Sequence, residues 1–520
     1  MIDLDAIATL ADIPAAQARA RGDAVAISFD GRDTSFAALD AASDRMAGAL
    51  IAAGVAPGDR VAVLTKNHDG WFPLFFGTAL ARACLAPINC RLTAREIGFI
   101  VGDAAPRLLF VGEDFFDTAL AAIAPLEVKP RLIALYGSHP DIEPLDSFLG
   151  HASAGRPAGA PQPDDDVLQL YTSGTTGLPK GVVLTNRNYR RFMEMSVDVA
   201  GFAYDPGDAV MIVMPLFHVA GTNVSFAGLS QGGRLVVVRD FVPSQAIATM
   251  QREGIAQTFL APALIGMMLN DPAIEGAAFP ALKAIAYGAS PIAEATLVRA
   301  RAVFGCDFVQ FYGMTESAGA GSTLAPAAHG EARLLTSCGR PWPGVEMTIF
   351  GPDDTHLPDD VIGEIAIRGD IVMKGYWNRP EATAETLAGG WLRTGDAGYR
   401  DASGHYYVHD RLKDMIVTGG ENVYPAEVEN AVAGCPGVRD VAVIGVPDPR
   451  WGEAVKALVV AGDEPPSAEA VIAWARERIA GYKAPKSVDF VSALPRNPSG
   501  KVLRRELRAP YWEGHGRAVG

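Results

Sequence analysis

Short apolar segments alternate with helical patterns over residues 23–150, and this alternation is the strongest restriction on the fold. Residues 24–29 read as a strand, and Ser35 is a suitable cap for a helix that begins at Phe36. Strands separated by helices favour parallel sheets covered by helices. The same pattern returns from residue 210 to about residue 345, so the sequence predicts an α/β fold. Further segments of the first stretch read as strands at 59–64, 85–88 and 108–111 and as an apolar helix at 71–81.

The pattern changes again in the last third of the chain. Residues 361–410 read as mostly strands, whereas residues 441–446 read as a strand and 468–479 as a helix. About 110 residues suffice for a small α+β domain. We therefore predict a large N-terminal domain of stacked α/β subdomains plus a β-rich part at residues 1–410, and a small α+β domain at 411–520.

Composition excludes several classes of protein. With 520 residues, 49% of them apolar, the chain is long enough for two or more domains. A net charge of −15 argues against general binding of nucleic acid. The five cysteines form no C-x-x-C pair, so we expect neither a disulfide framework nor a zinc site. Without a signal pattern or an apolar run of about 18 residues, the sequence predicts a cytoplasmic protein with no transmembrane segment.

Residues 171–183 form a strand–loop–strand pattern around a loop rich in glycine and hydroxyl groups. The sequence is Tyr-Thr-Ser-Gly-Thr-Thr-Gly-Leu-Pro-Lys-Gly-Val-Val. Glycines let backbone N–H groups approach an anion closely, and Lys180 adds a positive charge, so the loop suits a polyphosphate. It is not a Walker loop, because no Gly-Lys-Ser/Thr closes it into a helix. On these residues alone, a surface turn remains the alternative.

Residues 172–181 resemble the signature loop of the adenylate-forming superfamily, which includes acyl-CoA synthetases, luciferases and the adenylation domains of peptide synthetases. The resemblance extends over about residues 20–510. It implies an ATP-dependent acid–CoA ligase that forms acyl-AMP and then acyl-CoA. ATP, Mg²⁺, coenzyme A and a small carboxylic acid are the implied cofactors and partners. It also implies that the small domain is mobile about a hinge at Lys413.

The resemblance implies a set of nucleotide-binding residues. Tyr312 suits stacking on a purine, Asp396 suits the ribose hydroxyls, and Glu316 with Thr176 suits Mg²⁺, a hard cation. By themselves Thr315 and Glu316 also read as a helix start, and Asp396 as a turn residue. The implied set is Thr172, Ser173, Gly174, Thr175, Thr176, Gly177, Lys180, Gly288, Ala289, Ser290, Gln310, Phe311, Tyr312, Gly313, Met314, Thr315, Asp396, Arg411 and Lys501.

The implied catalytic residues are Lys501, His218, Glu316 and Thr175. Lys501 would bridge the substrate carboxylate and the α-phosphate, and His218 would orient the acid. Without the resemblance, His218 beside Phe217 is explained by packing, and the basic residues around Lys501 by a solvated tail. The implied pocket for the acid is His218, Val219, Ala220, Gly221, Gly313 and Ala318.

The small residues Ala220, Gly221, Ala318 and Gly319 predict a roomy apolar pocket, and no Lys or Arg adjoins these segments to pair a second carboxylate. We therefore expect a fatty or aryl-alkanoic acid, with a benzoate- or cinnamate-type acid as the alternative. The implied coenzyme A contacts are Gly419, Gly420, Asn422, Trp451 and Lys486. A carrier protein as acyl acceptor, a non-catalytic nucleotide-binding relative and a homodimer remain open.

Overall fold

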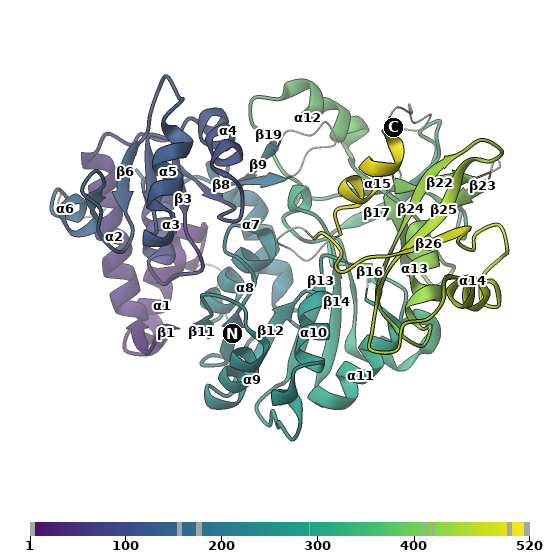
Figure 1. Ribbon diagram of the computed structural model, residues 1–520. Helices are drawn as coiled ribbons and strands as arrows, with labels where there is room; N and C mark the ends of the chain where they lie inside the picture. Colours follow the sequence, from purple (N-terminus) through teal and green to yellow (C-terminus); the bar gives the residue numbers. More distant parts are fainter. Residues whose placement is uncertain are drawn as a thin grey trace.

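The structure is a computed structural model that describes residues 6–152, 159–172, 179–290, 292–411, 414–418, 421–496 and 502–513, without the side chains of 409–411 and 422. Within these ranges the chain forms four sheets. Figure 1 shows the early segments, in purple and blue, at one end of the molecule and the yellow-green C-terminal unit at the other. The predicted fold class, a large α/β domain with a β-rich part and a small α+β domain, is confirmed.

The first large sheet gathers strands from residues 60–185 and one short strand from much later in the chain. Its central strands are parallel, whereas the strands at 166–172 and 180–185 form an antiparallel pair. The two strands predicted on either side of residues 173–178 therefore pair with each other. The strand order is β19 (Gly375–Tyr376), β9 (Lys180–Thr185), β8 (Asp166–Thr172), β4 (Cys84–Ile88), β3 (Arg60–Leu64), β5 (Leu108–Val111), β6 (Arg131–Ala134) and β7 (Glu143–Pro144).

The second large sheet carries the later α/β repeat. Its six inner strands are parallel to one another, and antiparallel strands lie at both edges. The strand order is β16 (Arg340–Pro341), β15 (Ser322–Leu324), β14 (Asp307–Tyr312), β13 (Ala284–Gly288), β12 (Ile255–Leu260), β10 (Ala209–Ile212), β11 (Arg234–Val237), β1 (Val25–Phe29) and β2 (Arg32–Ser35).

Helices pack between and around these two sheets. The helices α3 (Trp71–Leu80) and α8 (Val219–Ser230) are buried on nearly all sides, as expected of helices that are apolar all round. Their contact is aromatic, because the rings of Phe75 and Phe226 lie 4.5 Å apart between centroids. The largest core cluster includes residues of both sheets and of these helices. This core therefore joins the two α/β units.

The other helices of the two units either contribute to this central core or cover the opposite faces of the two sheets. The helix α2 (Phe36–Ala52) begins where predicted, since the Ser35 side chain accepts a hydrogen bond from the Ala38 amide. The remaining helices are α1 (Ile13–Arg21), α4 (Ala94–Ala104), α5 (Phe116–Ile123), α6 (Leu145–Leu149), α7 (Asn186–Ser196), α9 (Pro243–Arg252), α10 (Pro262–Leu269) and α11 (Glu294–Phe304).

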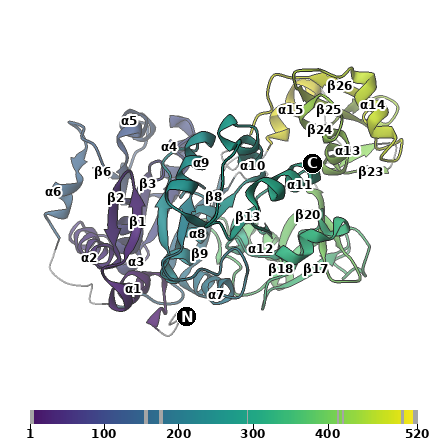
Figure 2. The ribbon, with the colours of Figure 1, turned by 90° about the horizontal axis from the view of Figure 1, so that it is seen from below.

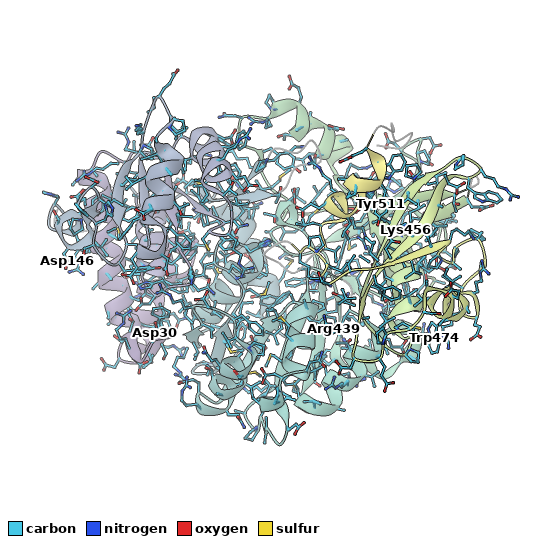
Figure 3. All side chains as sticks on the ribbon, in the orientation of Figure 1. Asp30, Asp146, Arg439, Lys456, Trp474 and Tyr511 are labelled. Atoms are coloured by element: carbon cyan, nitrogen blue, oxygen red, sulfur yellow. The ribbon has the colours of Figure 1, made fainter. Side chains whose placement is uncertain are left out.

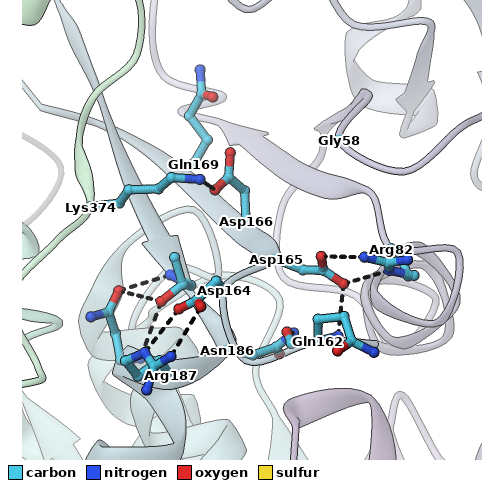
Figure 4. Close-up of polar contacts among 12 residues, drawn as sticks. Gly58, Arg82, Gln162, Asp164, Asp165, Asp166, Gln169, Asn186, Arg187 and Lys374 are labelled. Atoms are coloured by element: carbon cyan, nitrogen blue, oxygen red, sulfur yellow. Dashed lines mark hydrogen bonds and ion pairs between the residues drawn. The ribbon is translucent and has the colours of Figure 1, made fainter. Parts of the chain in front are cut away.

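Three consecutive aspartates fix the start of β8, which leads to the glycine-rich loop. Each aspartate pairs with a cation from a different part of the chain, so the strand is held from several sides (Figure 4). The pairs are Asp164–Arg187 (2.9 Å), Asp165–Arg82 (2.8 Å), Asp166–Arg60 (2.8 Å) and Asp166–Lys374 (2.7 Å).

The β-rich part is an antiparallel sheet of four strands in the described residues, with the short helix α12 (Pro380–Thr386) before its third strand. Its order is β17 (Glu346–Phe350), β18 (Gly363–Arg368), β20 (Leu392–Arg400) and β21 (Tyr406–Arg411). The next strand belongs to another sheet and begins at Ile416. The chain therefore changes sheets between residues 411 and 416.

The C-terminal unit is a sheet with helices on both faces, and it stands at one end of the molecule in Figure 2. The helices α13 (Pro425–Ala433) and α14 (Ala468–Arg476) cover one face, and α15 (Arg504–Trp512) packs on the other. The helix predicted at 468–479 ends at Arg476, three residues earlier than predicted. The strands are β23 (Glu421–Val423), β22 (Ile416–Thr418), β25 (Gly452–Ala461), β24 (Val438–Asp448) and β26 (Ser487–Phe490).

The helix α15 is held to this sheet by Tyr511, which lies beside Lys456 in Figure 3. The Lys456 ammonium lies 4.8 Å from the centroid of the Tyr511 ring, and the Tyr511 hydroxyl donates to Asp489 of β26. Among the described residues, no helix is both long and apolar enough to span a membrane.

Candidate active site

Two of the predicted nucleotide segments follow neighbouring parallel strands. Gly288 ends β13 and pairs in register with Phe311 of β14. A Cβ at Gly288 would overlap the Phe311 carbonyl oxygen, so glycine permits this close approach. Residues 288–290 and 312–316 therefore leave the sheet side by side at its carboxyl edge, where open α/β sheets commonly bind ligands.

A buried carboxylate faces this edge from the β-rich sheet. Asp396 of β20 is 6% exposed and accepts a hydrogen bond of 2.8 Å from the Tyr312 hydroxyl. Burial, followed by the nearby Asp396 charge, raises the pKa of Tyr312 well above its usual range. Tyr312 is therefore a neutral donor that orients the Asp396 carboxylate. The backbone of Arg411 pairs opposite Asp396, but its side chain lies outside the described residues.

A second buried carboxylate, Glu316, lies just after β14. Glu316 is 6% exposed and accepts a hydrogen bond of 2.9 Å from the Tyr376 hydroxyl. The Lys180 ammonium lies 4.9 Å from the centroid of the same tyrosine ring. Thr315, which precedes Glu316 in a short 3₁₀ turn, is also buried. The structure thus brings together a carboxylate and the lysine that follows the glycine-rich loop.

These residues suit Mg²⁺ bound together with a phosphate ligand. The described residues contain no group of three or more His, Cys, Asp or Glu side chains that could hold a metal ion by themselves. Mg²⁺ commonly takes one or two carboxylates and completes its shell with phosphate oxygens and water. Glu316 offers one such carboxylate next to a lysine, and its chemistry therefore fits. The other predicted ligand, Thr176, lies outside the described residues.

Local strain and an unpaired acceptor also mark this edge. Ala289 and Ala318 adopt left-handed backbone conformations, with φ of 68° and 48°. Such a conformation costs a non-glycine residue about 1–2 kcal/mol, and strain of this kind gathers at functional sites. The Gln310 Oε1 atom is buried and has no hydrogen-bond partner among the described residues. A buried acceptor of this kind commonly meets a ligand or water.

His218 precedes α8 at the wall expected to hold the acid. Its ring is partly buried, and desolvation, followed by the positive charge of Arg91, lowers its pKa from 6.5 to about 4. The imidazole is therefore neutral at pH 7, which fits a hydrogen-bonding role better than a charged one. The sequence shows no cation beside the pocket segments, so the influence of Arg91 was missed. Arg91 follows β4 and lies about 130 positions before His218 in the chain.

The pKa of His218 predicts a pH-dependent stability. Between pH 6.5 and 4, His218 is mostly protonated in the unfolded chain but mostly neutral in the folded protein. The free energy of unfolding therefore falls as the pH drops through this range. From pH 7 to pH 5 we expect wild type to lose about 2 kcal/mol more than His218→Gln. Urea unfolding of both proteins at the two pH values measures this difference. Equal losses would show that His218 titrates normally.

The glycines of the expected pocket wall serve close packing of the backbone. A Cβ at Gly221 would overlap the Pro215 carbonyl oxygen, and a Cβ at Gly313 would overlap that of Gly319. Gly221 is therefore no evidence for a roomy pocket, since backbone fills the space beside it. The roomy pocket stays a prediction. Val219, Ala220 and Ala318 complete this wall, and Asn223 of α8 donates to the Ala318 carbonyl over 2.7 Å.

The two described side chains expected to contact coenzyme A lie on the C-terminal unit. Trp451 is 41% exposed, and the Arg450 guanidinium lies 4.5 Å from the centroid of its ring. The Lys486 ammonium donates to the Gly481 carbonyl over 2.9 Å. An exposed aromatic ring beside an arginine suits stacking with a base and pairing with a phosphate.

Ion pairs neutralise much of the basic character expected near the end of the chain. Most of the cations in the tail and in the 482–486 segment that the structure describes contact carboxylates of the same unit. These residues therefore hold the C-terminal unit together. The pairs are Lys483–Glu427 (2.7 Å), Arg496–Asp440 (2.7 Å), Arg504–Glu429 (2.7 Å) and Arg508–Asp414 (2.6 Å).

Several predicted residues lie outside the described residues. They are Ser173, Gly174, Thr175, Thr176, Gly177, Lys413, Gly419, Gly420 and Lys501, together with the side chain of Asn422. Their roles stay predictions. Conversely, the sequence did not single out Tyr376. Its only local signal is the aromatic pair Tyr376-Trp377 after a glycine. Its side chain contacts Lys180 of β9 and Glu316, which are at least 60 positions away.

Comparison with known proteins places this arrangement in one family. The profile described as AMP-binding enzyme matches residues 14–377, and that described as AMP-binding enzyme C-terminal domain matches residues 427–501. The fatty acid–[acyl-carrier-protein] ligase ScoC of Streptomyces coeruleorubidus is 39% identical over 503 residues, 95% of each chain. The feruloyl-CoA synthase of an Amycolatopsis species is 38% identical over 500 residues, 96% of this chain and 98% of its own.

The architecture agrees with a solved structure as well. The Mycobacterium tuberculosis fatty acyl CoA synthetase superposes with a TM-score of 0.76 and 33% identity, covering 98% of this chain and 99% of its own. The chain belongs to the AMP-binding enzyme family, and its named relatives are acid–thiol ligases.

Proposed function

We propose that this chain is an ATP-dependent acid–CoA ligase that forms an acyl-AMP and then an acyl-CoA. The observation that carries the proposal is the pair of buried carboxylates, Asp396 and Glu316, each oriented by a tyrosine hydroxyl around the carboxyl edge of one sheet. The Asp396 carboxylate, which the Tyr312 hydroxyl orients, suits hydrogen bonds from the two ribose hydroxyls. The Glu316 carboxylate lies near Lys180 and suits a metal ion bound to the phosphates.

In the first half-reaction a carboxylate oxygen of the acid attacks the α-phosphorus of ATP. The bond from this phosphorus to the oxygen that bridges to the β-phosphorus breaks, and pyrophosphate leaves with the electron pair. Lys180 and the glycine-rich loop bind the departing phosphates, and Lys501 stabilises the charge at the α-phosphoryl group. Glu316 and Thr176 would hold Mg²⁺, which would supply further charge neutralisation at the phosphates.

In the second half-reaction the thiol sulfur of coenzyme A attacks the acyl carbon of the mixed anhydride. The thiol proton passes to solvent, and AMP leaves with the electrons of the broken C–O bond. Neutral His218 orients the acyl group without adding a charge to the apolar wall. We propose that residues 1–410 and 411–520 form two domains that pivot at Lys413 between the two steps. The change of sheet between residues 411 and 416 supports this division.

We propose a fatty or aryl-alkanoic acid as the substrate. The names of two relatives, the carrier-protein ligase and the M. tuberculosis synthetase, refer to fatty acids, which supports this class. The feruloyl-CoA synthase supports an aromatic acid as the second candidate. Coenzyme A is the proposed acceptor because Trp451 and Arg450 present a stacking and cationic surface. The carrier-protein ligase ScoC makes a carrier protein the alternative acceptor.

Release of pyrophosphate across a panel of acids tests the substrate class. The panel includes hexadecanoate, 3-phenylpropanoate, 4-hydroxycinnamate, benzoate, acetate and malonate. Burying each additional methylene is worth about 0.8 kcal/mol, so we expect kcat/KM for the preferred acid to exceed that for acetate at least tenfold. Thioester formation is then compared with coenzyme A and with a phosphopantetheinylated carrier protein. Activity with acetate or malonate alone would contradict the proposed class.

If the chain binds ATP but releases no pyrophosphate with any acid, it is instead a non-catalytic nucleotide-binding protein. A reaction without added acid is the control, because it measures hydrolysis of ATP by water. Thioester formed only on the carrier protein would replace coenzyme A as the acceptor and leave the adenylation step unchanged.

A further inference from the structure

A segment between β18 and α12 crosses the edge of the first sheet next to β9, the strand that follows the glycine-rich loop. We define the strap as residues 373–377. Its backbone amides bind two separate parts of the candidate site. The Met373 amide donates to the Glu316 carbonyl (2.8 Å), and the Trp377 amide donates to the Gly181 carbonyl (2.7 Å). The strap thus connects the turn after β14 to the strand that begins at Lys180.

Contacts away from the site hold the strap in place. The Arg60 guanidinium, which is nearly buried, lies 3.5 Å from the centroid of the Trp377 ring. The Trp377 indole N–H donates to the Asp103 carbonyl over 3.0 Å. On the preceding side Lys374 pairs with Asp166, as Figure 4 shows. These contacts fix the backbone on both sides of Tyr376, so its side chain is directed by the fold.

Tyr376 touches the two charged groups of the phosphate side of the site with different parts of one side chain. Its hydroxyl donates to Glu316 Oε1 over 2.9 Å, which directs the carboxylate. Its ring lies under the Lys180 ammonium at 4.9 Å, within the range of a cation–π contact. The hydroxyl and the ring are separable chemically, because phenylalanine keeps the ring and leucine keeps neither.

We propose that Tyr376 is a positioning residue that sets the geometry of Glu316 as a metal ligand and of Lys180 as a phosphate contact. This inference rests on the proposed function, since the roles of Glu316 and Lys180 belong to that function. A hydrogen bond to a ligating carboxylate orients it, and loss of such a partner commonly lowers metal affinity 10–100-fold. Tyr376 therefore controls the binding of the metal–ATP complex without contacting the acid.

Binding of Mn²⁺ to the protein–ATP complex, followed by the loss of the free Mn²⁺ EPR signal, tests the hydroxyl. We expect the dissociation constant for Mn²⁺ to rise about tenfold in Tyr376→Phe. Equilibrium binding of ATP without a divalent metal tests the ring. We expect wild-type affinity in Tyr376→Phe and a loss of about fivefold in Tyr376→Leu. The KM for the acid should stay unchanged in both variants.

Tyr407→Phe is the matched control. Tyr407 of β21 also donates its hydroxyl to a carboxylate over 3.2 Å, but its partner Asp401 lies in the turn between β20 and β21. The control should bind Mn²⁺ and ATP as wild type does. Thermal unfolding checks that each variant is folded. If Tyr376→Leu is unfolded, the Mn²⁺ result for Tyr376→Phe decides the proposal alone.

The outcomes separate this inference from the proposed function. Wild-type Mn²⁺ affinity in Tyr376→Phe would overturn the positioning role even if the enzyme is a ligase. A tenfold loss in Tyr376→Phe, together with a wild-type protein that releases no pyrophosphate with any acid, would support the positioning role and reject the ligase. A wild-type protein that binds neither ATP nor Mn²⁺ would overturn both.

Discussion

Replacing Lys501 by alanine is expected to lower the rate of acyl-adenylate formation about 1000-fold, the cost of removing a strong donor to a transition-state charge. The rate at which supplied acyl-AMP reacts with coenzyme A should change less than about threefold. The reason is electrostatic, because charge on the α-phosphoryl oxygens grows during the displacement by the carboxylate. In the second step the α-phosphate is part of the leaving AMP and needs no such stabilisation.

Pyrophosphate release and thioester formation from synthetic acyl-AMP measure the two steps separately. Arg505→Ala is the control, since Arg505 is an exposed cation four residues further along the chain, and its loss should affect neither step more than twofold. An equal decrease in both half-reactions of Lys501→Ala would contradict a role restricted to adenylation. Lys501→Arg should stay impaired, because the guanidinium replaces a compact charge by a planar one.

The second large effect is expected at Asp396. Asp396→Ala should lower kcat/KM for ATP about 100-fold, since two hydrogen bonds from the ribose hydroxyls to a charged group are lost, each worth about 1.5–3 kcal/mol before partial compensation by water. The KM for the acid should change less than twofold. Steady-state kinetics with each substrate varied in turn measures both constants.

The Tyr312 hydroxyl provides an internal check on Asp396. Tyr312→Phe removes the donor that orients the carboxylate over 2.8 Å, and we expect a loss of about tenfold in kcat/KM for ATP. In a double-mutant cycle the two losses should not add, because they act on one contact. Asp354→Asn, on an exposed aspartate paired with Arg393 of the same sheet, is the control. Additive losses would show that Tyr312 acts on ATP independently of Asp396.

Local patterns predicted the elements of this fold well. The strand at residues 24–29, the cap at Ser35 and the helix from Trp71 all depend on neighbours in the chain, and the structure contains each of them. The helix beginning at Ala468 ends earlier than its apolar pattern suggests. Beyond Arg476 the chain continues through turns.

The parts of the site that the sequence missed depend on long-range contacts. Strand β19 has only two residues, which is too short for a pattern of alternating residues, so the sequence did not predict its pairing with β9. The influence of Arg91 on His218 and the tyrosine contact to Glu316 arise only when separate loops meet. Gly221 shows a different limit of sequence reasoning, because the sequence does not distinguish a glycine that makes room for a ligand from one that makes room for backbone.

The late arrival of β19 also has a consequence for biosynthesis. In the finished sheet β19 covers the outer edge of β9, although about 190 residues separate the two strands in the chain. At synthesis rates of about 5–20 residues per second, β19 is made roughly 10–40 seconds after β9. During this time, until residues 375–376 are synthesised, the outer edge of β9 therefore lacks its partner strand and is exposed to pairing with a wrong strand.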